Sequence, residues 1–115
     1  MSLRILPLVL AAVLILPAAA AQDSELYFIA PEDGATVSNP VRVVFGLRGM
    51  GVAPAGVERD NTGHHHLLID TGLPPLDQPI PADDHHKHFG HGQTETEITL
   101  SPGEHTLQLL LGNYA

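Results

Sequence analysis

Seven of the eight histidines in this chain lie between positions 64 and 91. Neutral imidazole is a good ligand for zinc and copper ions, and a site needs several rings that converge on one point. Residues two apart on a strand face the same way, about 6.6 Å apart. The spacing therefore lets His64 and His66 share one ion, as it does His86 and His88 if their segment is extended. This pattern predicts a site for a divalent metal, copper or zinc, formed from His64, His66, His85, His86, His88 and His91.

The same histidines also fit a structural role without any metal. The segment Asp83–His88 reads Asp-Asp-His-His-Lys-His, which is typical of a solvated polar loop. His65 falls on the opposite strand face from its two neighbours, where we expect a buried, hydrogen-bonded histidine. The alternative to a metal-binding protein is thus a structural or interaction module, in which the histidines only order a long loop.

The sequence predicts no catalytic residues. It lacks the His-Glu-x-x-His motif of zinc proteases and the Gly-x-Ser-x-Gly motif of serine hydrolases. The absence of cysteine excludes thiol catalysis, iron–sulfur clusters and cysteine-based zinc sites. Glu95 and Glu97 are spaced as on one strand face, where exposed carboxylates are ordinary. We therefore expect a binding protein and not an enzyme.

The N-terminus has the order of a cleavable signal peptide. One positive charge at Arg4 precedes an apolar run over residues 5–16, and small residues follow up to Ala20 and Ala21. The apolar run is shorter than the roughly 20 residues that a membrane-spanning helix needs. We expect residues 1–21 to be removed on export, most simply to the periplasm, leaving residues 22–115 as a single domain without a membrane span.

The charge of the chain limits its partners. Thirteen acidic residues against five Lys and Arg give a formal net charge of −8. Such a surface repels nucleic acids and anionic lipids, so neither is expected as a partner. The sequence indicates no particular protein partner. Without disulfides, the domain must be stabilised by its core, a metal or a partner.

The segments that must position the histidines are short strands separated by Pro and Gly. Apolar or alternating runs occur at residues 26–29, 41–48, 64–70, 94–100 and 105–111. This pattern predicts an all-β fold, a small immunoglobulin-like β-sandwich. The longest connection, Thr71–Gln93, is long enough to be functional or disordered.

Two features concern the end of the chain. The turn sequence Ser101–Glu104 predicts a hairpin between the runs 94–100 and 105–111. A further turn signal, Gly112-Asn113, is followed by only two residues. The sandwich is therefore predicted to lack its last strand, which would leave an apolar edge open to association.

Four motifs give the chain a family resemblance. They are Thr62–Asp70 (TGHHHLLID), Leu73–Pro81 (LPPLDQPIP), His88–Glu95 (HFGHGQTE) and Pro102–Gly112 (PGEHTLQLLLG). With them the chain resembles the small exported bacterial proteins of domain-of-unknown-function family 4399. The resemblance implies export and a small β domain, and it implies no activity. Members of that family continue beyond the last of these motifs with a histidine-rich loop and another strand, whereas this chain ends at Ala115. More weakly, Pro31–Pro40 resembles the opening of bacterial immunoglobulin-like domains.

Overall fold

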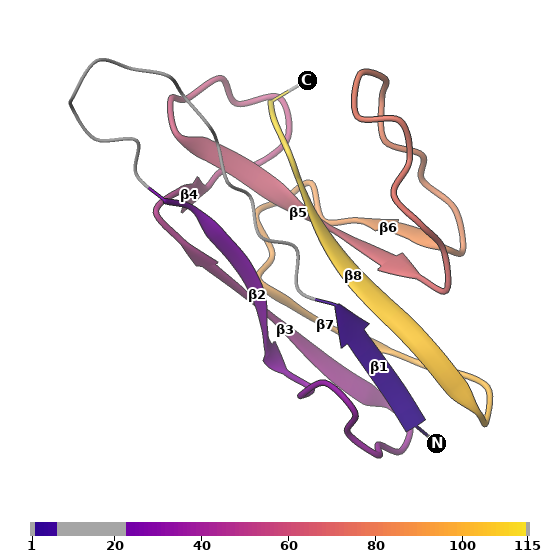
Figure 1. Ribbon diagram of the computed structural model, residues 1–115. Helices are drawn as coiled ribbons and strands as arrows, with labels where there is room; N and C mark the ends of the chain where they lie inside the picture. Colours follow the sequence, from indigo (N-terminus) through magenta and orange to yellow (C-terminus); the bar gives the residue numbers. More distant parts are fainter. Residues whose placement is uncertain (1, 7–22, 115) are drawn as a thin grey trace.

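The computed structural model describes residues 2–6 and 23–114, which form two facing β-sheets without any helix (Figure 1). The first sheet has the order β1-β8-β5-β4, with β6 also paired to β5; the second has the order β2-β3-β7. No helix among the described residues is long and apolar enough to cross a membrane. The predicted all-β sandwich is confirmed. The first sheet contains β1 (Ser2–Leu6), β4 (Gly51–Val52), β5 (Thr62–Ile69), β6 (His86–His88) and β8 (Glu104–Gly112); the second contains β2 (Glu25–Ala30), β3 (Val41–Arg48) and β7 (Glu95–Ile98).

The core lies between the two sheets and follows from the period-two alternation of the strands. On β3, Val41, Val43 and Phe45 are buried while Arg42 is exposed. The opposing sheet supplies aliphatic side chains from β5 and β8, three of which, Leu67, Leu107 and Leu109, are fully buried. Each such side chain contributes about 1.5–3 kcal/mol through burial. Among the described residues, the buried members of this core cluster are Leu26, Val41, Val43, Phe45, Leu67, Ile69, Phe89, Leu100, Leu107 and Leu109.

β5 is buried on both of its faces. Every residue from Gly63 to Ile69 is buried, whereas a strand with one solvated face would alternate between buried and exposed residues. The odd-numbered residues face the second sheet, as the core members Leu67 and Ile69 show. The even-numbered residues His64 and His66 face outward and lie beneath part of the Thr71–Gln93 connection. That connection is partly ordered, because it includes β6. His64 and His66 are thus shielded from water because this connection covers the outer face of β5.

The predicted hairpin between residues 94–100 and 105–111 is wrong. β7 pairs antiparallel with β3 in the second sheet, and β8 pairs antiparallel with β5 in the first. The Pro-Gly turn between them carries the chain from one layer to the other. The burial of the two strands explains the separation: β7 exposes Glu95 and Glu97, which suits the uncovered second sheet, whereas β8 buries Leu110 on the face opposite Leu109.

The far edge of β8 has a partner in the described residues. β1 pairs with it in parallel, from Ser2 opposite Glu104 to Leu6 opposite Gln108 (Figure 1). The edge that the sequence predicted to be open is therefore covered over this length. The strand β1 belongs to the predicted signal peptide, of which residues 7–21 lie outside the described residues. Removal of the signal peptide, and a further strand after β8, stay predictions.

A histidine–aspartate pair joins the end of β5 to the start of β8. The ring of His105 lies 2.6 Å from Asp70 Oδ2 through Nδ1, and 2.6 Å from the Ser101 carbonyl oxygen through Nε2. Both partners only accept hydrogen bonds, so both ring nitrogens can donate only in the protonated imidazolium. The hydrogen bonds with Asp70 and Ser101 accordingly raise the pKa of His105 above its ordinary value. Asp70 Oδ1 also accepts a hydrogen bond from the Thr106 backbone N–H at 2.8 Å.

We expect this pair to make the stability of the domain depend on pH. Since the pKa of His105 is raised by folding, its contribution is complete below the unfolded value of about 6.5 and is lost as the pH rises through the folded value. Asp70→Asn should lower the free energy of unfolding by about 1 kcal/mol at pH 5.5. The difference from wild type should shrink at pH 8.5. Urea unfolding at both pH values measures it, with Asp84→Asn as the control for an exposed carboxylate. A difference that does not change with pH would contradict the assignment.

Candidate metal centre

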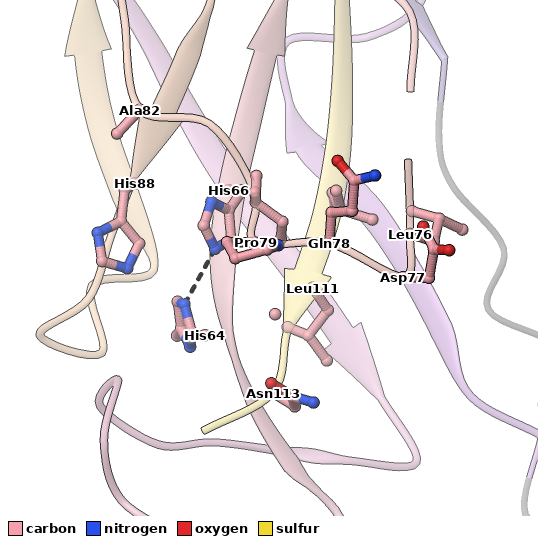
Figure 2. A pocket seen from close by; sticks show the side chains of 13 residues that line it. His64, His66, Leu76, Asp77, Gln78, Pro79, Ala82, His88, Leu111 and Asn113 are labelled. Carbon is pink, nitrogen blue, oxygen red and sulfur yellow. Dashed lines mark hydrogen bonds between the residues drawn. The ribbon is translucent and has the colours of Figure 1, made fainter. Parts of the chain in front are cut away.

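Three histidine side chains converge outside the first sheet (Figure 2). His64 and His66 come from β5 and His88 from β6, and each offers a ring nitrogen within 4.8 Å of the others. The Nε2 atoms of His64 and His66 lie 2.9 Å apart. The three ring centroids form a nearly equilateral triangle, with separations of 4.8, 4.9 and 4.8 Å. Imidazoles in this arrangement can bind one metal ion together.

Ordinary strand geometry produces this convergence. His64 and His66 are two residues apart on β5, so their side chains leave the same face. His88 lies directly opposite His66 in the antiparallel pairing of β5 with β6, where Cβ atoms are about 4.5–5.5 Å apart. The predicted pairing of His64 with His66 on one face is thus found in the structure. The third member is set by the register between the two strands.

Burial favours the neutral form of the two cluster histidines on β5, His64 and His66. Their exposed fractions are 2% for His64 and 4% for His66. Burial, and then the neighbouring histidines, lower the pKa of His64 below its ordinary value and that of His66 to about 4. A metal binds neutral imidazole, so these rings are already in the state that coordination requires. Protons should therefore compete with a metal for these rings at a lower pH than the ordinary histidine pKa implies.

The Nδ1 atoms of these two rings have no hydrogen-bond partner among the described residues. Nδ1 of His64 and Nδ1 of His66 are both buried without a hydrogen bond. A histidine that binds metal usually donates a hydrogen bond from its second nitrogen, which fixes the ring and raises affinity 10–100-fold. Here packing must orient the rings instead. This difference favours a site of moderate affinity.

Gly112 leaves the space that an ion would need beside the rings. It lies opposite His64 in the pairing of β5 with β8. A Cβ atom at this position would lie 2.8 Å from His66 Nε2 and 2.9 Å from His64 Nε2. Any other residue would therefore crowd both Nε2 atoms. Gly90 is similarly close to His88, since a Cβ there would lie 2.7 Å from its Cε1.

The distances within the cluster suit coordination with a small movement of one ring. Metal–nitrogen bonds of about 2.0–2.1 Å place two donors about 2.9 Å apart at a right angle and about 3.3 Å apart in a tetrahedron. The His64–His66 separation of 2.9 Å matches the first of these. His88 is exposed and can turn toward the ion to close the remaining distance. Three imidazole ligands leave at least one further position on the metal.

The other predicted ligands are placed elsewhere. His85 Nδ1 lies 2.8 Å from the Ile69 carbonyl oxygen, and His86 Nδ1 lies 2.6 Å from Asp83 Oδ1. His91 lines a second depression with Gly90 and Gln93, to which His88 also contributes, but it does not belong to the convergent group. β6 is extended, which was the condition for His86 and His88 to share an ion, but only His88 belongs to the convergent group. The contacts of His85 and His86 order the long connection, which is the structural role considered as the alternative.

His65 is buried, as predicted, but the predicted hydrogen bond is wrong. Neither of its ring nitrogens has a partner among the described residues. Its ring packs against Phe45, with the centroids 4.9 Å apart, and burial followed by the charge of His64 lowers its pKa to about 4. The inner face of β5 packs against the buried apolar residues of the core. His65 cannot join the cluster because it faces the opposite side of the strand.

Comparison with known proteins gives one match. The family model described as Domain of unknown function (DUF4399) matches residues 43–115, a span that includes all eight histidines and Gly112. No curated protein and no solved structure matches the chain.

The space beside Gly112 leads to a prediction that changes no ligand. Gly112→Ala should weaken metal binding at least tenfold, because the added methyl group would crowd the Nε2 atoms of His64 and His66. Gly72→Ala is the control, since a Cβ at Gly72 meets nothing within 4 Å. Calorimetric titration with Zn(II) and Cu(II) compares the two variants, and thermal unfolding checks that both are folded. Binding by Gly112→Ala that equals that of Gly72→Ala would show that the ion does not lie between these rings.

Proposed function

Because the chain belongs to the DUF4399 family, whose function is unknown, we propose its function from the site: it is an exported, non-catalytic protein that binds a divalent metal, copper or zinc, through His64, His66 and His88. The observation that supports this most is the convergence of three imidazoles, two of which have their Nε2 atoms beside the side-chain-free Gly112. Two of these rings, His64 and His66, are already buried and neutral. Metal binding would therefore require little further loss of water and no loss of a proton.

The choice of metal follows from the ligands. Imidazole nitrogens suit copper and zinc, while calcium and magnesium prefer oxygen ligands. The chain has no cysteine and only two methionines, which argues against a sulfur-rich site for Cu(I). Copper(II) binds more tightly than zinc at a given set of nitrogen ligands. A pair of donors at 2.9 Å also fits the right angles that Cu(II) prefers.

Binding without turnover is proposed because the sequence supplies no catalytic motif beside the histidines. Catalysis at a metal site needs an acid, a base or a nucleophile in reach of the reacting atoms. Asp77 is the acidic residue of the adjacent cavity, and it is exposed on a loop. Such a carboxylate is too weakly fixed to hold a reacting group in place.

A structural role of the histidines remains the second candidate, and specific contacts favour it for part of the cluster. The bond between the Nε2 atoms of His64 and His66 satisfies both atoms without a metal. His85 and His86 are engaged with Ile69 and Asp83. In that case the ring packing of the cluster would add to the backbone pairing that holds β6 against β5.

Calorimetric titration of metal-free protein distinguishes the two functions. Wild type should bind Cu(II) or Zn(II) with a dissociation constant below about 10 μM, which corresponds to roughly −7 kcal/mol. His64→Ala combined with His66→Ala should abolish this binding. His85→Ala combined with His91→Ala is the matched control and should bind as wild type does, because neither residue belongs to the convergent group. Wild type that binds neither metal below 10 μM would leave the structural function.

The export of the protein is tested separately. N-terminal sequencing of the protein from the periplasmic fraction should begin at Ala21 or Gln22, because the small residues up to Ala21 fit the cleavage site. Soluble cytoplasmic protein that retains Met1 would contradict export. This outcome would not affect the metal site, which lies far along the chain from the signal peptide.

A further inference from the structure

A cavity of about 640 Å³ opens beside the histidine cluster. His64, His66 and His88 line one part of it, and residues 110–113 together with residues 76–80 and 82 of the long connection line the rest (Figure 2). Its size falls in the range of 300–1,000 Å³ that is usual for small-molecule sites, whereas one water fills about 30 Å³ of liquid. Coordination of a metal alone does not require so large a space.

We propose that the metal keeps one coordination position open toward this cavity, and that the position takes a small organic carboxylate with an apolar body. This inference rests on the proposed metal binding and names the ligand class of the same site. The three imidazoles supply three donors, and no acidic residue belongs to the convergent group found among the described residues. The position left over therefore faces the cavity.

The charge of the site favours an anionic donor. Three neutral imidazoles leave the double positive charge of the ion uncompensated. The one acidic side chain that lines the cavity, Asp77, is exposed and lies outside the convergent group. A carboxylate is a good oxygen donor that would neutralise part of this charge at short range. The amide of Gln78, which also lines the cavity, can donate a hydrogen bond to a second carboxylate oxygen.

The remaining lining favours an apolar body on that carboxylate. Leu76, Pro79 and Ile80 from the long connection and Leu110 and Leu111 from β8 contribute aliphatic surface. Such a lining binds methylene groups by removing them from water, at about a fourfold gain in affinity for each one that is buried. Acetate should therefore bind weakly, and longer carboxylates should bind progressively better until the cavity is filled.

The test uses the protein loaded with Co(II) or Cu(II), whose visible absorption changes when a new ligand enters the coordination sphere. Titration with acetate, propionate and butyrate should shift the spectrum, with the dissociation constant falling about fourfold for each methylene. Leu76→Ser should reduce that gain. Leu73→Ser is the matched control, because Leu73 lies on the same connection, is 45% exposed and does not line the cavity.

The possible failures separate this inference from the proposed function. If the metal binds but no carboxylate changes the spectrum, the open position does not exist and metal binding stands. If Asp77→Ala creates the response, Asp77 closes the site in the wild type and the inference is wrong. If acetate and butyrate bind equally, the apolar lining plays no part and the ligand class is wrong. If no metal binds, both proposals fail together.

Discussion

The burial of three successive imidazole rings on β5 is the main energetic constraint on this structure, because the surroundings of the strand must compensate for it. Four ring nitrogens in this strand have no hydrogen-bond partner among the described residues. Each buried polar atom left without a partner costs about 1–3 kcal/mol. In a small domain that is a large part of the net stability. A strand of purely aliphatic residues would avoid this cost, so the histidines must be explained by something other than packing.

The two faces of β5 answer this constraint differently. On the inner face, the ring of His65 contacts Phe45 and has no hydrogen-bond partner among the described residues, so its cost is not compensated by anything that the structure describes. On the outer face, His64 and His66 are directed toward each other, toward His88 and into a cavity. A metal bound on this outer face through the Nε2 atoms would join both rings, and their Nδ1 atoms would stay unpaired as they are without it. The asymmetry between the faces therefore favours a ligand site on the outside and leaves His65 without a physical explanation.

The strands and their faces could be predicted from the sequence, since alternation along one strand is a local property. The shared face of His64 and His66 follows directly from it. The choice of His88 over His86 as the third member could not be predicted. Which of the two pairs with His66 depends on how residues 71–85 fold, and no local pattern fixes this. The position of β8 beside β5 was missed for a similar reason, because a Pro-Gly turn serves a hairpin and a crossing between layers equally well. From the sequence, Gly112 is predicted only as a turn residue. Its closeness to the rings depends on the register of β5 with β8, which the sequence does not show.

Because the three histidines lie on two strands, a metal at the proposed site would also cross-link two parts of the chain. His64 and His66 stand on the central strand, whereas His88 stands on a three-residue strand that returns after a long connection. An ion held by all three would close that connection into a ring, as a disulfide closes a loop. Cross-links around loops of this size are worth on the order of 3 kcal/mol through the reduced entropy of the unfolded chain. The chain has no cysteine, so this cross-link would form and open with the supply of metal and would not depend on the redox state of the compartment.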